Sequence, residues 1–151
     1  MNMAIKLVIK DGTNFDLYFV DGVVKRYNIL LLSDKYPQLN ALKDRELFIK
    51  GKLIGWGGVM WNEELDVSSE TVYKEGIDVS LEYDDIENVV VGYLIKQKRL
   101  ELELSQDELA AKTGIDQSDL SKIEKGNYNP SIKLLSRIAA GLNSKININL
   151  D

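Results

Sequence analysis

The feature that most constrains this chain is a series of helix starts and stops in its last third. Ser105 is followed three residues later by Glu108, a spacing typical of a capping box that opens a helix. We expect Gly114 to end that helix in a left-handed turn, Asp116 to cap the next helix, and Gly126 to end it. The sequence therefore predicts two short helices joined by a tight turn.

The residues between these caps suit two helices that cross. Such a pair needs a small residue at the crossing, a glycine in the turn and an apolar anchor on the second helix. Ala110, Gly114 and Leu120 supply them in this order. Helical periodicity also predicts one helix before the pair, ending before Leu104, and another after it, opening at Ser131.

Four short segments carry a resemblance to a known family. They are Leu104-Ser105-Gln106-Asp107-Glu108-Leu109-Ala110, Gly114-Ile115, Leu120-Ser121-Lys122-Ile123-Glu124-Lys125-Gly126 and Asn129-Pro130-Ser131. Over roughly residues 88 to 142 the chain resembles the Xre and lambda-repressor-like helix-turn-helix family. The resemblance implies a DNA-binding domain whose third helix enters the major groove.

The resemblance also implies roles for individual residues. Gln106 is expected to contact a phosphate, and Glu124 to pair with Arg99. We interpret this pair as a structural ion pair, with a direct phosphate contact by Arg99 as the alternative. Base contacts are expected from four positions of the third helix: Gln117, Ser118, Ser121 and Lys122.

Helix geometry agrees with this assignment independently. The four positions and Lys125 share the face opposite Leu120 and Ile123, so they should face outward. Glutamine can read adenine through two hydrogen bonds, and lysine can reach guanine. Lys125, Asn127 and Asn129, at the helix end and in the following loop, suit phosphate contacts that set register. The alternative is a solvated helix face without a partner.

The chain departs from the family pattern at several points. Glu103 stands where the family usually has glycine, and Asp116 and Asp119 add negative charge beside the expected groove contact. The usual fifth helix is missing. In its place, apolar and polar residues alternate over residues 145 to 150, as in a strand. We expect this strand to join the sheet of the N-terminal domain or to pair with its copy across a dimer axis.

The N-terminal part of the chain is predicted to form short strands and turns. Strands are predicted at 4–9, 14–20, 23–29 and 51–61, with short helical segments at 29–32, 44–48 and 68–73. Asp11-Gly12 and Asp21-Gly22 should form hairpin turns. Gly55, Gly57 and Gly58 suit a turn or bulge better than a phosphate loop, since neither a helix start nor Lys-Ser/Thr follows them. Trp56 and Trp61 are expected to pack in a core or an interface.

These patterns define the predicted organisation. The fold class is α+β: a small antiparallel-sheet domain at residues 1–85, followed at 86–151 by an all-α, lambda-repressor-like helix-turn-helix domain with a C-terminal strand. The first domain, over about residues 3–80, also resembles a bacterial family of unknown function numbered 2442. The carrying residues are Leu17–Asp21 with Gly22, Leu42–Asp44, Leu47-Phe48, Val59–Asn62 and Glu64–Asp66. The resemblance implies an antitoxin-like regulator or a partner in a small-protein operon.

Composition weighs against several function classes. The chain of 151 residues has no cysteine and no histidine, so we expect no metal site, no cofactor and no catalytic residue. No apolar run is long enough to span a membrane, which predicts a cytoplasmic protein. The net charge of −5 belongs to residues 1–86, with 10 basic and 15 acidic side chains, whereas residues 87–151 carry 9 of each.

The function predicted from the sequence is sequence-specific DNA binding by a transcriptional regulator. We expect a repressor that is antitoxin-like and autoregulatory. Its partners would be double-stranded DNA with a pseudopalindromic operator, a second copy in a homodimer, and a small protein such as a toxin. The alternative is a protein-interaction adaptor that keeps the helical scaffold and does not bind DNA. The excess of acidic over basic residues favours this alternative.

Overall fold

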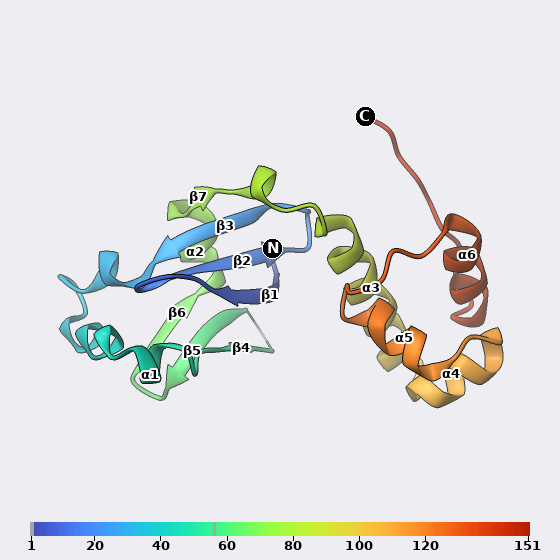
Figure 1. Cartoon of the computed structure of the whole chain (residues 1–151), viewed down its shortest axis with the longest axis horizontal. Coiled ribbons are helices and arrows are strands. Elements are labelled where there is room, and N and C mark those ends of the chain that lie inside the picture. Colours follow the sequence, from blue (N-terminus) through green and yellow to red (C-terminus); the bar gives the residue numbers. More distant parts are fainter. Residues whose placement is uncertain (1, 56) are drawn as a thin grey trace. The chain divides into compact units, whose positions relative to one another are not determined.

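The computed structural model describes residues 2–55 and 57–151, and the chain divides into two compact units at residues 1–86 and 87–151 (Figure 1). Trp56, which we expect from the sequence to pack in a core or an interface, lies outside the described residues. The first unit contains two small antiparallel sheets, and the second is helical. None of the helices in the described ranges is long and apolar enough to cross a bilayer.

The larger sheet of the first unit is a meander, as the sequence predicts. β1 (Ala4–Ile9), β2 (Asn14–Phe19) and β3 (Val24–Asn28) pair in order, and the short β7 (Ile77–Asp78) extends the sheet beside β3. The turns contain glycines with φ of 64° and 88°, at positions 12 and 22, which explains the Asp-Gly pairs between the strands. The sequence gives no clear signal for β7.

The smaller sheet corrects one prediction. The single strand predicted at 51–61 is wrong, because this segment forms two strands of a hairpin, β4 (Lys52–Ile54) and β5 (Gly58–Asn62), and β6 (Leu65–Ser68) pairs with β5. Gly57 has a φ of 105°, a conformation that a side chain would strain, so the glycines mark a turn inside the predicted strand.

Short helical segments connect the strands. The predicted ones are present as η1 (Ile29–Leu32), α1 (Arg45–Phe48) and α2 (Ser69–Glu75), whereas η2 (Pro37–Lys43) and η3 (Ser80–Glu82) were not predicted. Both sheets contribute to one apolar core, in which Phe15, Phe19, Phe48, Val59 and Trp61 are buried. Trp61 stacks on Phe48 and donates a hydrogen bond to its carbonyl oxygen at 2.7 Å.

The helical unit follows the predicted caps. It contains α3 (Ile86–Glu101), α4 (Gln106–Thr113), α5 (Gln117–Glu124) and α6 (Ile132–Gly141). Its core is built from α3 to α6 and includes Leu109, Ala110, Leu120, Ile123 and Ile138. Ala110 and Leu120 are therefore buried, as the crossing of two short helices requires.

Cap geometry explains where these helices begin and end. The Ser105 hydroxyl accepts a hydrogen bond from the Glu108 backbone, and the Glu108 carboxylate accepts one from the Ser105 backbone. Gly114 ends α4 with a φ of 71°, and Ser131 caps α6. Asp116 occupies the N-cap position of α5, but its side chain accepts no cap hydrogen bond, so the predicted Asp116 cap is only positional.

The predicted C-terminal strand is not formed. Residues 145–150 have no regular secondary structure in the described chain, and residues 142–144 separate them from the end of α6. Alternation of apolar and polar residues is a local property, whereas a strand also needs a second strand for its backbone hydrogen bonds. The helical unit contains no such strand among its described residues.

Candidate nucleic-acid interface

One face of α5 is exposed and polar. Gln117, Ser118 and Lys122 are exposed and Ser121 is half-buried. On the opposite face, Leu120 and Ile123 are buried in the helical core. The four residues predicted to contact bases therefore lie on the outward side of α5, as their spacing indicates.

The position of α5 depends on close backbone contacts with α3. A Cβ atom on Gly92 would lie 2.2 Å from the carbonyl oxygen of Ile123, and one on Gly126 would lie 2.8 Å from Cα of Val89. No side chain fits between the two helices at these points. Sequence reasoning identified Gly126 only as a helix end and missed Gly92, although an isolated glycine in a helical pattern is a signal for close packing.

The Arg99–Glu124 ion pair is formed and buried. Arg99 donates from Nε to Oε2 of Glu124 at 2.7 Å and from Nη2 to Oε1 at 3.0 Å, and its Nη1 donates to the Leu104 carbonyl oxygen at 2.7 Å. The hydrogen bonds to Glu124 raise the pKa of Arg99 above its usual value. Since Arg99 is 7% exposed and its guanidinium is engaged on both sides, the geometry supports a structural role.

Two glutamines extend this pair to the surface of α5. Gln106 Nε2 donates to Oε1 of Glu124 at 3.1 Å, and Gln117 Nε2 donates to Oε1 of Gln106 at 2.7 Å. The result is a continuous chain of hydrogen bonds from Arg99 to Gln117. It orients the Gln117 amide while leaving its oxygen and second N–H for an external partner. Sequence reasoning missed this link, because no local pattern connects residues on two different helices.

The residues predicted for phosphate contacts lie at one end of α5. Lys125 is the C-cap residue, and Asn127 and Asn129 are exposed in the loop that leads to α6. Gly126 turns the chain between them with a φ of 77°. The structure thus places these three residues next to the outward face, whereas Gln106 is half-buried and hydrogen-bonded to Glu124.

The turn between α4 and α5 is held by a residue that sequence reasoning missed. Arg137, on α6, donates from Nη2 to the Thr113 carbonyl oxygen at 2.5 Å, at the C-terminal end of α4. A cation is favourable there because helix C-termini carry partial negative charge. The basic residue on a following helix is a weak signal, since its partner depends on the tertiary fold.

The exposed face of α5 has little net charge. Glu124 is neutralised inside the fold by Arg99, so the remaining charges of α5 are Asp119 and Lys122, followed by Lys125. Asp116 lies at the N-terminus of α5, where the helix dipole favours a negative side chain. Lys122 and Lys125 therefore give the C-terminal half of this face its positive charge.

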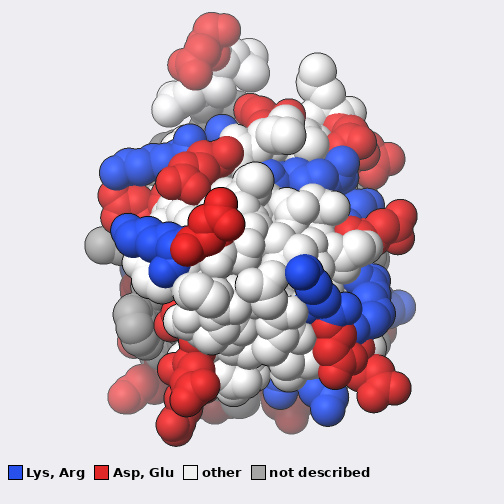
Figure 2. Space-filling model, turned by 90° about the vertical axis from the view of Figure 1, so that its left-hand side faces the viewer, with Lys and Arg blue, Asp and Glu red and all other residues white. Residues whose placement is uncertain are grey.

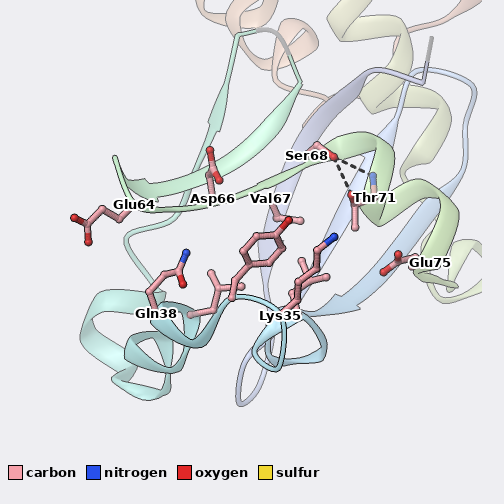
Figure 3. A pocket seen from close by; sticks show the side chains of 11 residues that line it. Lys35, Gln38, Glu64, Asp66, Val67, Ser68, Thr71 and Glu75 are labelled. Atoms are coloured by element: carbon pink, nitrogen blue, oxygen red, sulfur yellow. Dashed lines mark hydrogen bonds between the residues drawn. The ribbon is translucent and has the colours of Figure 1, made fainter.

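The first unit contains a separate pocket of about 460 Å³ between η1, η2, β6 and α2. Figure 3 shows Lys35, Gln38, Glu64 and Asp66 around it, with the hydroxyls of Ser68 and Thr71 hydrogen-bonded to each other at 3.0 Å. The described residues contain no group of three or more acidic, histidine or cysteine side chains that could hold a metal ion.

The face of the first unit seen in Figure 2 mixes charges of both signs around an uncharged centre. Such a face lacks the concentrated positive charge that phosphate binding uses. The structure therefore offers α5 and its following loop as the stronger candidate for contact with nucleic acid.

Comparison with known proteins agrees with this geometry. The family model described as Helix-turn-helix matches residues 95–148. The ImmF control region 10 kDa protein of Bacillus phage phi105 is 48% identical over 58 residues, which are 38% of this chain and 64% of that protein. An uncharacterized HTH-type transcriptional regulator of Archaeoglobus fulgidus is 42% identical over 52 residues, which are 34% of this chain and 73% of the relative. The chain belongs to the helix-turn-helix family of transcriptional regulators.

A solved structure is also similar to part of this helix-turn-helix protein. It is the tetramer of the restriction-modification controller protein C.Esp1396I with its natural 35-base-pair operator, which is 36% identical and covers 38% of this chain and 76% of that one, with a TM-score of 0.38. The family model begins at residue 95, so the resemblance of residues 3–80 to the family numbered 2442 is not confirmed and stays a prediction.

Proposed function

We propose that this protein is a sequence-specific DNA-binding repressor whose α5 enters the major groove. The observation that carries the proposal is the exposed polar face of α5, held by close backbone contact with α3 and by the buried Arg99–Glu124 pair. Family membership and the similarity to an HTH-type transcriptional regulator of Archaeoglobus fulgidus support a role in transcriptional regulation. In this assignment Gln117 and Lys122 read bases, while Lys125, Asn127 and Asn129 contact phosphates.

The operator is proposed to be pseudopalindromic. A single module of this size rarely binds DNA tightly, and such modules read two half-sites about 34 Å apart when they act as dimers. A homodimer in the cytoplasm, repressing its own promoter, fits this arrangement. The first unit would then bind a small protein such as a toxin, for which Leu31 and Ile49, exposed by 68% and 53%, offer apolar contact.

The test is a mobility shift with the protein's own upstream DNA at low and physiological salt, with nonspecific competitor present. Gln117→Ala and Lys122→Ala should each weaken specific binding by about 1 to 3 kcal/mol per lost base contact. Lys50→Ala is the matched control, since it removes an exposed lysine from the first unit. Unchanged operator affinity in both α5 variants would contradict the assigned contacts.

An adaptor that does not bind DNA is the second candidate. The net charge of −5, with Asp116 and Asp119 beside the proposed groove contact, favours it. The same mobility shift separates the two functions. Specific binding that falls steeply with salt supports the repressor, whereas no binding at either salt supports the adaptor.

A further inference from the structure

The end of α6 directs the chain into an extended segment. Asn143 adopts a φ of 54°, its N–H bonds the Ala140 carbonyl at 3.1 Å, and the Ser144 N–H bonds the Ala139 carbonyl at 2.8 Å. This is the hydrogen-bond pattern of a Schellman motif, which stops a helix and satisfies its last carbonyls. The residues that follow, 145–151, here called the tail segment, therefore leave α6 without continuing it (Figure 1).

The tail segment exposes apolar side chains in alternation. Ile146, Ile148 and Leu150 alternate with polar residues, and their exposed fractions are 36%, 61% and 95%. In the described chain the backbone of this segment pairs with no strand. An extended segment with one apolar face and unpaired backbone groups is a template for pairing with another strand.

The sequence of the tail segment is complementary to itself when it runs antiparallel. We propose that the tail segments of two copies pair as antiparallel strands around a two-fold axis at Ile148. In this register Ile146 lies opposite the partner's Leu150, and Lys145 lies opposite the partner's Asp151. Asn147 lies opposite the partner's Asn149. Apolar residues thus pair with apolar residues, amides pair with amides, and each lysine pairs with an aspartate.

Other arrangements lose these pairings. A shift by one residue would turn one strand's apolar side chains toward the other strand's polar face. A parallel pair in register would place Lys145 opposite Lys145 and Asp151 opposite Asp151, and like charges directly opposite each other are destabilising. A two-fold axis also requires one patch to bind itself, which the antiparallel register satisfies.

A groove in the helical unit offers support for this ribbon. Between α3, α6 and the start of the tail segment lies an apolar groove of about 410 Å³, whose lining includes Leu94, Leu135, Ala139 and Ile146. Leu94 is 52% exposed there. A two-stranded ribbon alone is marginally stable in water and needs a packed apolar face. Because Ile146 already lines the groove, the apolar face of the ribbon is continuous with it.

The absence of cysteine makes the pairing directly testable. This inference rests on the proposed dimeric reading of an operator, and the experiment is done without DNA so that the two can fail separately. Ile148→Cys places a thiol on the axis, opposite its own copy at a separation that a disulfide can bridge. Asn147→Cys is the matched control, because residues 147 of the two strands would lie more than about 7 Å apart.

Under mild oxidation of the full chain, Ile148→Cys should give a covalent dimer at least tenfold faster than Asn147→Cys. Equal rates, a faster reaction at position 147, or no cross-linking at either position would each overturn the proposed register.

A charge exchange provides a second test. Lys145→Asp should raise the dimer dissociation constant on the order of tenfold in sedimentation equilibrium at low salt, because two opposite-charge pairs become like-charge pairs. The double variant Lys145→Asp with Asp151→Lys should restore dimerisation. If the double variant is no tighter than the single one, these residues are not opposite each other and the proposal is wrong.

Discussion

At the residue scale, Glu103 departs from the family pattern at a position whose backbone conformation favours glycine. It adopts a φ of 58° between α3 and α4, a left-handed conformation that costs a residue with a side chain about 1 to 2 kcal/mol. Glycine adopts this conformation without that strain. The position where the resemblance leads us to expect glycine is thus a strained turn in this chain.

Glu103→Gly should therefore stabilise the helical unit. We expect the free energy of unfolding in urea to rise by about 1 kcal/mol, because the relief of strain exceeds the extra flexibility of the unfolded chain. Lys96→Gly, at an exposed position inside α3, should lower it by about 1 kcal/mol as a control. A loss of stability in both variants would show that the turn is not strained.

At Gly92, in contrast, we expect that adding a side chain destabilises the helical unit. Gly92→Ala should lower the free energy of unfolding by about 1 to 3 kcal/mol, because its methyl group would collide with the Ile123 carbonyl and push α5 away from α3. Gly55→Ala is the control, since a Cβ atom there meets nothing within 4 Å. Urea unfolding followed by circular dichroism measures both. A neutral Gly92→Ala would contradict the close contact.

At the scale of elements, the helix caps differ in their contribution. Ser105 makes both hydrogen bonds of a capping box, whereas the Asp116 side chain makes no cap hydrogen bond. Ser105→Ala should cost about 1 kcal/mol of stability, and Asp116→Ala only a few tenths. Thermal unfolding of the two variants compares them directly, and an equal loss would contradict the difference in cap geometry.

The helices of the second unit were predictable because their signals are local. Ser105, Gly114 and Ser131 fix helix ends through bonds to residues a few positions away. The first unit was harder, since the hairpin of β4 and β5 alternates like one strand until Gly57 reverses it. β7 contains two residues, Ile77 and Asp78, and is defined only by its pairing with β3.

The candidate site also combines features that local sequence patterns predict with features that depend on the tertiary fold. Helical spacing alone put Gln117, Ser118 and Lys122 on the outward face of α5. The close approach at Gly92 and the link between Gln106 and Gln117 join different helices, so they depend on the tertiary fold and could not be derived from spacing.

At the scale of the whole molecule, the buried tyrosines of the first unit lead us to expect that it loses stability at alkaline pH. Tyr18 and Tyr27 are buried and donate to Asp85 and Glu75 at 2.7 and 2.8 Å. Burial, together with these carboxylates, raises the pKa of both phenols well above the usual value. The folded form therefore keeps protons that the unfolded chain loses above about pH 10.

The stabilisation from these phenols is complete below pH 10 and is lost as pH rises above it. We expect the free energy of unfolding to fall by up to about 1.4 kcal/mol per pH unit for each buried phenol. Urea unfolding at a series of alkaline pH values should show a shallower fall in Tyr27→Phe. Tyr36→Phe, which changes an exposed ring, is the control. An identical pH dependence in wild type and Tyr27→Phe would contradict the effect.

The hydrogen-bond chain from Arg99 through Glu124 and Gln106 to Gln117 has a consequence for how such a protein diverges. In the proposed assignment the Gln117 amide meets the operator, and its orientation depends on the buried Arg99 and Glu124 through the half-buried Gln106. Under that assignment, we expect a substitution at Arg99 or Glu124 to alter which base is preferred while the residues on the outward face of α5 are unchanged. Related repressors with identical outward faces on this helix need not recognise identical promoters.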